Sequence, residues 1–191
     1  MQPSACKDDQ VLGSVASKRI LQMSFSNENN VTEKLALLLS DDHEYTVMII
    51  DLKFDSGKGK NNKGSKAGRK GEPEFIHLNK EPIEKTFTEI LTKVTFNPKN
   101  DTELCTSGVN HWKVWRLNPD NQLKSAQPFH KNIPTTNRTF TDHIWIDKTQ
   151  LLGCTSEGEF YFVDGNGTEL KQVEEHAFQD SDANSHVVCI Q

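Results

Sequence analysis

The sequence predicts an all-β protein assembled from antiparallel sheets. Short apolar alternations recur along the 191 residues, and Asn, Asp, Gly or Pro bound each one, which is typical of strands joined by tight turns. Helical apolar spacing gives little comparable signal. Leu, Ile, Val and Phe make up 46 of the 191 residues, about 24%, which exceeds the roughly 20% below which a charged chain stays disordered. We therefore expect a folded chain with a small core.

Each expected strand is a short apolar or aromatic run between turn residues. In chain order the strands are 20–26, 35–40, 45–52, 75–78, 91–97, 103–107, 111–117, 142–147, 151–155, 159–163 and 169–173, and the last residues, HVVCIQ, begin another. The run Asp164-Gly165-Asn166-Gly167 favours the positive φ of a tight hairpin between the last two strands of that series.

A long internal repeat organises these strands. Aligning the chain with itself superposes Phe25, Phe96 and Trp145, which are 71 and 49 residues apart, and it also superposes Cys105 on Cys154. Without the 14 residues at 58–71 the first offset becomes 57, which approaches the roughly 40 to 45 residues of a four-stranded propeller blade. A sheet with two apolar faces becomes stable when others stack on it around an axis. The fold class predicted is a partial β-propeller.

We expect about three four-stranded antiparallel blades and the first strand of a fourth. The predicted divisions are a disordered N-terminus at 1–14, a divergent blade at 15–87 with a basic loop insertion at 58–71, blades at 88–132 and 133–178, and the start of a next blade at 179–191. Because propellers need roughly 4 to 8 blades, we expect either a longer protein or a partner that completes the ring.

The repeat segments VTFNPKNDTELCTSGVNHWKVWRL and HIWIDKTQLLGCTSEGEFYFVDGNG resemble WD40-like propellers, in particular the WD-repeat cilia- and flagella-associated proteins. The resemblance implies a non-catalytic scaffold of the ciliary or flagellar axoneme, located in the cytoplasm and cilium, that helps to regulate motility. Its implied partners are axonemal proteins such as inner dynein arm components or tubulin. The alternative is a propeller-type enzyme or a cytoplasmic propeller-type binding module outside cilia.

The chain departs from the WD-repeat pattern at its most characteristic positions. Trp115 occupies the signature Trp, but Arg116 replaces the Asp that should follow, and the other two copies have Ile50 and Val163 in place of the Trp. No Gly-His dipeptide opens a repeat. We therefore expect the buried hydrogen-bond network of such blades to be incomplete and aromatic packing to replace it.

A basic segment at 58–71 is one candidate for partner binding. It holds six positive charges and no acid, at Lys58, Lys60, Lys63, Lys66, Arg69 and Lys70. Without apolar residues it should form a loop, and clustered Lys attracts polyanions such as acidic tubulin tails or nucleic acid. The segment contains no aromatic residue for base stacking, which disfavours nucleic acid.

Trp112 and Trp115 are three residues apart, so they should face opposite sides of one strand. The repeat alignment places Trp115 inside, with Ile50 and Val163. Trp112 and His111 then become candidates for a contact with a partner at the rim, because Trp is enriched in binding hot spots.

Motifs of catalytic or metal-binding chemistry do not emerge from the sequence. The four cysteines and seven histidines lack ligand spacing. Gly59 and Gly64 have P-loop separation, but Ser65 precedes Lys66, the reverse of the required order. We expect no enzyme activity, no cofactor and no metal. The longest apolar run, 35–39, is far short of the roughly 20 residues that span a bilayer, so no membrane segment is expected.

Overall fold

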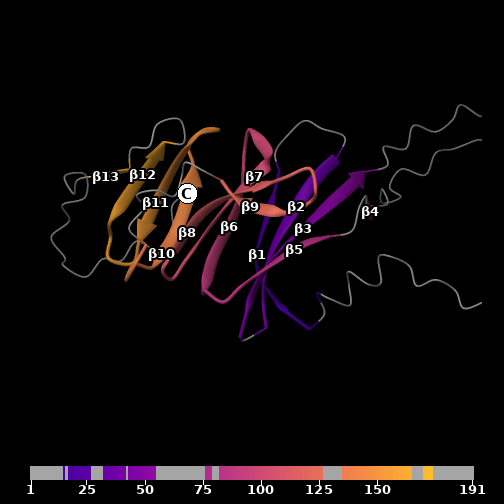
Figure 1. Cartoon of the computed structure of the whole chain (residues 1–191), viewed down its shortest axis with the longest axis horizontal. Coiled ribbons are helices and arrows are strands. Elements are labelled where there is room, and N and C mark those ends of the chain that lie inside the picture. The colour runs from indigo at the N-terminus through magenta and orange to yellow at the C-terminus, as the bar shows by residue number, and fades with distance from the viewer. Residues whose placement is uncertain are drawn as a thin grey trace, which may run out of the picture.

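The computed structural model consists of three antiparallel β-sheets lying side by side (Figure 1). The residues it describes are 15, 17–26, 32–41, 43–54, 76–78, 82–126, 135–164 and 170–173. The all-β prediction is confirmed, and each sheet forms one blade. The predicted segments 1–14, 58–71 and 179–191 lie outside the described residues.

The first blade contains five strands: β1 (Arg19–Phe25), β2 (Thr32–Ser40), β3 (Tyr45–Phe54), β4 (Ile76–Leu78) and β5 (Ile83–Phe87). The ten-residue strand β3 is long enough to pair with two partners in succession. Tyr45 to Ile49 pair with β5, and Leu52 to Phe54 pair with β4. The two short strands thus share the outer edge of β3.

The second and third blades are simple four-stranded meanders in chain order. The second blade contains β6 (Leu91–Asn97), β7 (Asn100–Gly108), β8 (His111–Leu117) and β9 (Leu123–Ser125). The third contains β10 (Phe140–Trp145), β11 (Gln150–Thr155), β12 (Phe160–Asp164) and β13 (Leu170–Val173).

The strand register confirms the predicted repeat. Three residues lie opposite one another across the first three strands of each blade, and the sets are Phe25–Leu35–Ile50, Phe96–Leu104–Trp115 and Trp145–Leu151–Val163. Each first strand also has a register shift at the same repeat position, between Ile20 and Gln22, between Leu91 and Lys93, and between Phe140 and Asp142. The three blades are therefore structural copies down to the placement of a bulge.

The predicted superposition of Cys105 on Cys154 is wrong by two residues. Cys105 lies opposite Thr95, whereas Cys154 lies opposite Asp142, the repeat equivalent of Lys93. The cause is the hairpin length, because the chain takes eight residues from Phe96 to its partner Leu104 but only six from Trp145 to its partner Leu151. Since side chains alternate with a period of two, the two cysteines still point to the same side of their blades.

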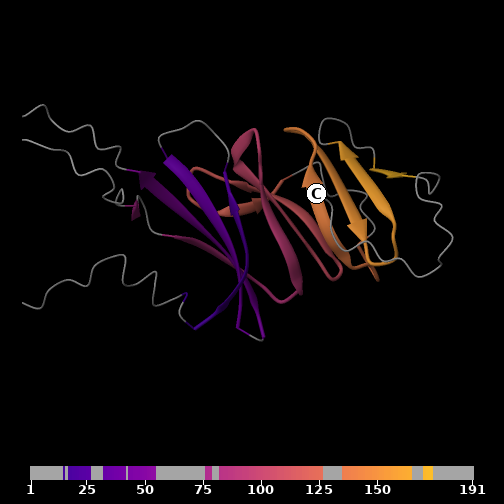
Figure 2. The same cartoon turned by 180° about the vertical axis from the view of Figure 1, so that it is seen from behind.

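The blades stack face to face as wedges. One core lies between the first and second blades and includes Leu38, Ile49, Val94 and Trp115, and another lies between the second and third and includes Trp112 and Phe140. The close strand contacts between blades all involve a first strand: β6 meets β1 and β2, and β10 meets β6 and β7. Seen from behind, the middle blade again separates the other two (Figure 2). This is the arrangement of consecutive blades in a WD40-like β-propeller.

Two strands, β5 and β9, are not predicted from the sequence. The residues of β5, IEKTF, alternate between exposed and partly or fully buried, and β9 has only three residues, two of them exposed. Outer strands bury little surface, so their apolar signal is weak. In the part of the chain that the structure describes, no helix has the length and hydropathy needed to cross a bilayer.

Candidate functional site

The residues predicted to bind a partner are not arranged as the sequence suggested. The six basic residues of 58–71 lie outside the described residues. His111 and Trp112 are described, but their side chains are 0% and 1% exposed. The prediction that they form an exposed rim contact is wrong, because both faces of β8 are covered by neighbouring blades.

Trp112 is instead part of the joint between the second and third blades. Its ring stacks on Phe140 at a centroid distance of 4.9 Å. A Cβ atom placed on Gly153 would lie 2.7 Å from Cζ2 of this ring. Glycine at 153 therefore lets the β11 backbone approach the indole directly, and the ring fills the space that a side chain would take.

A buried hydrogen-bond network ties the strands of the second blade together. Thr106 Oγ1 accepts from Nε1 of Trp115 at 2.8 Å and lies 2.7 Å from Nε2 of His111. In the second blade His111, after the β7–β8 turn, supplies a buried imidazole to this network although no Gly-His dipeptide is present. The predicted incompleteness of the network across the three blades stays a prediction. The predicted aromatic packing is also found, with Phe87 edge-on to Trp115 at 5.4 Å.

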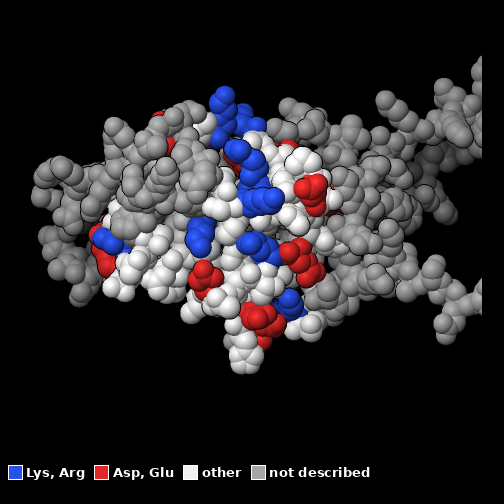
Figure 3. Space-filling model, in the orientation of Figure 1, with Lys and Arg blue, Asp and Glu red and all other residues white. Residues whose placement is uncertain are grey.

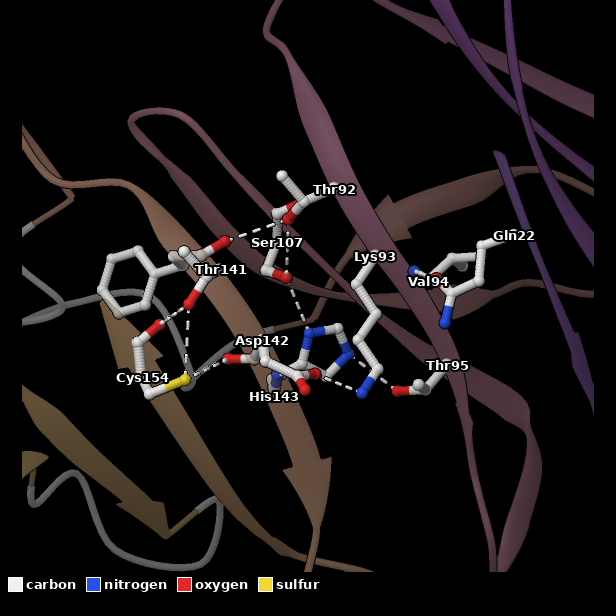
Figure 4. A network of polar contacts seen from close by, with 11 residues as sticks. Gln22, Thr92, Lys93, Val94, Thr95, Ser107, Thr141, Asp142, His143 and Cys154 are labelled. Carbon is white, nitrogen blue, oxygen red and sulfur yellow. Dashed lines mark hydrogen bonds and ion pairs between the residues drawn. The ribbon is translucent and has the colours of Figure 1, made fainter. Parts of the chain in front are cut away.

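A second polar cluster joins the first strands of the second and third blades (Figure 4). Lys93 donates to the carboxylate of Asp142, and both side chains are largely buried. The two ring nitrogens of His143 lie 2.7 Å from Thr95 Oγ1 and 2.9 Å from Ser107 Oγ. We call these five residues the polar lock.

The protonation of the polar lock follows from its burial. Burial, followed by the positive charge of Lys93, lowers the pKa of His143 to about 3, and the opposing effect of Asp142 is smaller. The imidazole is therefore neutral at physiological pH, with one nitrogen donating and the other accepting. A neutral, fully bonded imidazole holds two blades together but is not available to take a proton from a substrate.

Backbone edges of the first strands are covered by side chains from the adjacent blade. Gln22 Oε1 accepts from the amide of Val94 at 2.6 Å, and Ser24 Oγ accepts from the amide of Phe96 at 3.0 Å. Between the next two blades, Thr92 Oγ1 donates to the carbonyl of Phe140 at 3.0 Å. These contacts satisfy polar groups at strand edges that have no further strand beside them.

The remaining reactive groups are poorly suited to catalysis. Burial raises the pKa of the thiols of Cys105 and Cys154, so neither is a ready nucleophile. Within the described ranges, no group of three or more His, Cys, Asp or Glu side chains could hold a metal ion. The buried polar groups described above bond either within the second blade or between the second and third blades.

An exposed apolar row on β1 is the surface feature most suited to binding. Ile20, Met23 and Phe25 are 47%, 58% and 55% exposed, and we call them the front row. Sequence reasoning missed the row, although the repeat offset of 71 residues could have identified it. The offset pairs these residues with Leu91, Val94 and Phe96, which belong to a core.

Charge on the described surface is mixed. Figure 3 shows Lys and Arg side chains along the middle of one face with Asp and Glu beside them. Some of the basic groups form ion pairs, such as Arg138 with Glu159 and Arg116 with Glu103. The face that is visible does not form a field of a single sign.

Together, the repeated wedges, the bulged first strands and the interlocked blade faces define a protein of the β-propeller class. No family model matches the chain, and no curated protein matches its sequence. Among solved structures, the crystal structure of the WD40 β-propeller domain of Doa1 is similar at 9% identity and a TM-score of 0.33, over 84% of this chain and 74% of that one. The class assignment rests on the sheets themselves.

Proposed function

We propose that this chain is a non-catalytic propeller scaffold whose role is to bind other proteins. The observation that carries the proposal is the front row, since an exposed apolar cluster on a blade face is a typical interaction surface. The polar lock supports the non-catalytic role, because its buried His, Lys and Asp side chains form contacts between blades.

A narrower placement, in the ciliary or flagellar axoneme, is supported by the resemblance of residues 88 to 175 to the WD-repeat cilia- and flagella-associated proteins. On this proposal the chain resides in the cytoplasm and cilium, and its partners are inner dynein arm components or tubulin.

Tagging the chain in ciliated cells and extracting the cilia with detergent tests this placement. Retention with the axoneme is expected, together with chemical cross-links to dynein-arm or tubulin peptides. Release into the soluble fraction without such cross-links would overturn the axonemal placement. Cross-links to other proteins would leave the scaffold role standing.

A second function, polyanion binding through 58–71, is favoured by the six positive charges of that segment. Its test is salt-dependent co-sedimentation with microtubules, either native or stripped of their acidic tails. Binding that survives both deletion of 58–71 and tail removal would rule this function out.

A further inference from the structure

The outer edge of β1 carries main-chain groups that no other strand of the described sheets pairs with. Within those sheets, β1 pairs with β2 alone. The amide of Ser26, directly after β1, donates to the carbonyl of Lys34 at 2.9 Å. Because the hydrogen-bonding groups of successive residues in a strand point to opposite edges, the amides of Met23 and Phe25 point away from β2. These two residues therefore present their main chain at the free edge.

The same amide is bonded in the other two blades. By register Val94 is the equivalent of Met23, and its amide donates to Gln22 of the first blade (Figure 4). The equivalent in the third blade, His143, donates its amide to the carboxylate of Asp142. Among the described residues, no group accepts from the amide of Met23. β1 thus keeps a main-chain donor that the fold uses elsewhere.

The exposed apolar surface at this edge is one strand wide. Four of the six exposed large apolar side chains in the described part of the chain lie on β1, and they are Ile20, Leu21, Met23 and Phe25. On β2, Leu37 and Leu39 are only 5% and 0% exposed, although they lie opposite members of the front row. An open surface of this width fits a single extended segment, whereas a partner with a broad face would find the rest of the blade already covered.

We infer that β1 binds an extended segment of a partner protein, which joins the sheet as a further strand. The main chain of the segment bonds to the amides and carbonyls of Met23 and Phe25, and its alternate apolar side chains pack on the front row. Arg19 begins β1 and is exposed, so an acidic residue at the adjoining end of the segment is favoured. This binding mode rests on the proposed scaffold role, and it adds the kind of partner segment and the atoms that hold it.

Peptides provide the first test. A phage-displayed library of random twelve-residue peptides is panned on the full chain, and the enriched sequences should alternate apolar and polar residues. In a synthetic copy of an enriched peptide, methylating the amides along one edge should weaken binding at least about tenfold. Methylating the alternate amides, along the other edge, should leave binding unchanged. Equal effects of the two sets, or no enrichment over a blank surface, would overturn strand addition.

Variants at Met23 separate the main chain from the side chain. Met23→Pro removes the free amide but spares the β1–β2 ladder, because an edge strand tolerates proline where the nitrogen faces away from its neighbour. It should weaken peptide binding about tenfold more than Met23→Ala, which keeps the amide. Ile90→Ala is the matched control, since Ile90 is 50% exposed but lies outside β1, and it should bind as the parent does.

The outcomes distinguish this binding mode from the scaffold role. Equal losses in Met23→Pro and Met23→Ala would indicate docking through side chains alone, which would overturn strand addition and leave the scaffold role standing. Circular dichroism verifies that the variants are folded. If Met23→Pro unfolds, the two sets of methylated peptides decide the question on the parent chain.

Discussion

Replacing Gly153 with alanine should destabilise the protein, although Gly→Ala within a strand ordinarily stabilises. A Cβ atom at this position would lie 2.7 Å and 2.8 Å from two carbons of the Trp112 ring. The ring cannot easily retreat, because it is 1% exposed and stacks on Phe140. The added methyl group must therefore push two blades apart or force the indole off its rotamer.

The size of the effect can be worked from these contacts. Overpacking of a core costs about 1 to 3 kcal/mol, and the removal of a strand glycine offsets about 0.5 to 1 kcal/mol. The free energy of unfolding should thus fall by about 1 kcal/mol, and by about 2.5 kcal/mol at most. The melting temperature of a chain of this length should fall by about 2 to 4 °C, and by about 10 °C at most.

Urea unfolding followed by tryptophan fluorescence and circular dichroism measures this loss. In a Trp112→Leu background the obstructing ring is gone, so Gly153→Ala should become neutral or stabilising there, giving a measurable coupling energy. An equal loss in both backgrounds, or no loss in the parent, would refute the direct contact between the Trp112 ring and the β11 backbone.

Three further predictions concern the buried polar groups. Thr106→Val should lower the free energy of unfolding by about 1 to 3 kcal/mol, because it removes the hydroxyl that bonds to two buried ring nitrogens. Thr106→Ser keeps the hydroxyl, so its stability in urea unfolding should be close to that of the parent. Because the pKa of His143 is about 3 when folded and 6.5 ordinarily, the unfolded chain binds more protons between these values. Stability should therefore decline as pH falls through this window, by up to about 1.4 kcal/mol per pH unit. His143→Gln should make the free energy of unfolding less dependent on pH in this window. An unchanged pH dependence would contradict the prediction. Lys93→Met alone should lower the free energy of unfolding by about 3 to 5 kcal/mol, because Asp142 stays buried without its cation. In a double-mutant cycle, adding Asp142→Leu should restore much of that free energy.

The sequence predicts the strands and the repeat well because both are local or periodic signals. Ile50, Trp115 and Val163 do align across the blades as expected. The prediction that Trp112 is exposed is wrong, because Trp112 is 1% exposed. The spacing of three correctly places Trp112 and Trp115 on opposite faces, but in a stack of blades the opposite face is also a core.

Features that depend on hairpin length or on pairing between distant segments could not be predicted from the sequence. The two extra residues between Phe96 and Leu104 shift the cysteine alignment, and nothing in the composition of the turn reveals the shift. The polar lock joins residues 36, 48 or 49 positions apart, so Lys93 and Asp142 look like ordinary surface charges until the blades are stacked.

The polar positions of the first strands also distinguish the two blade-to-blade joints from each other. Gln22, Lys93 and Asp142 follow the bulge at the same repeat position, yet they differ in chemistry. Gln22 accepts from the backbone of the second blade, whereas Lys93 requires the carboxylate of the third. A third blade docked directly on the first would bury Asp142 beside a neutral amide, at a cost of about 3 to 5 kcal/mol. The position after the bulge, together with the contacts of His143 with Thr95 and Ser107, therefore makes the joint between the second and third blades chemically distinct from the joint between the first and second.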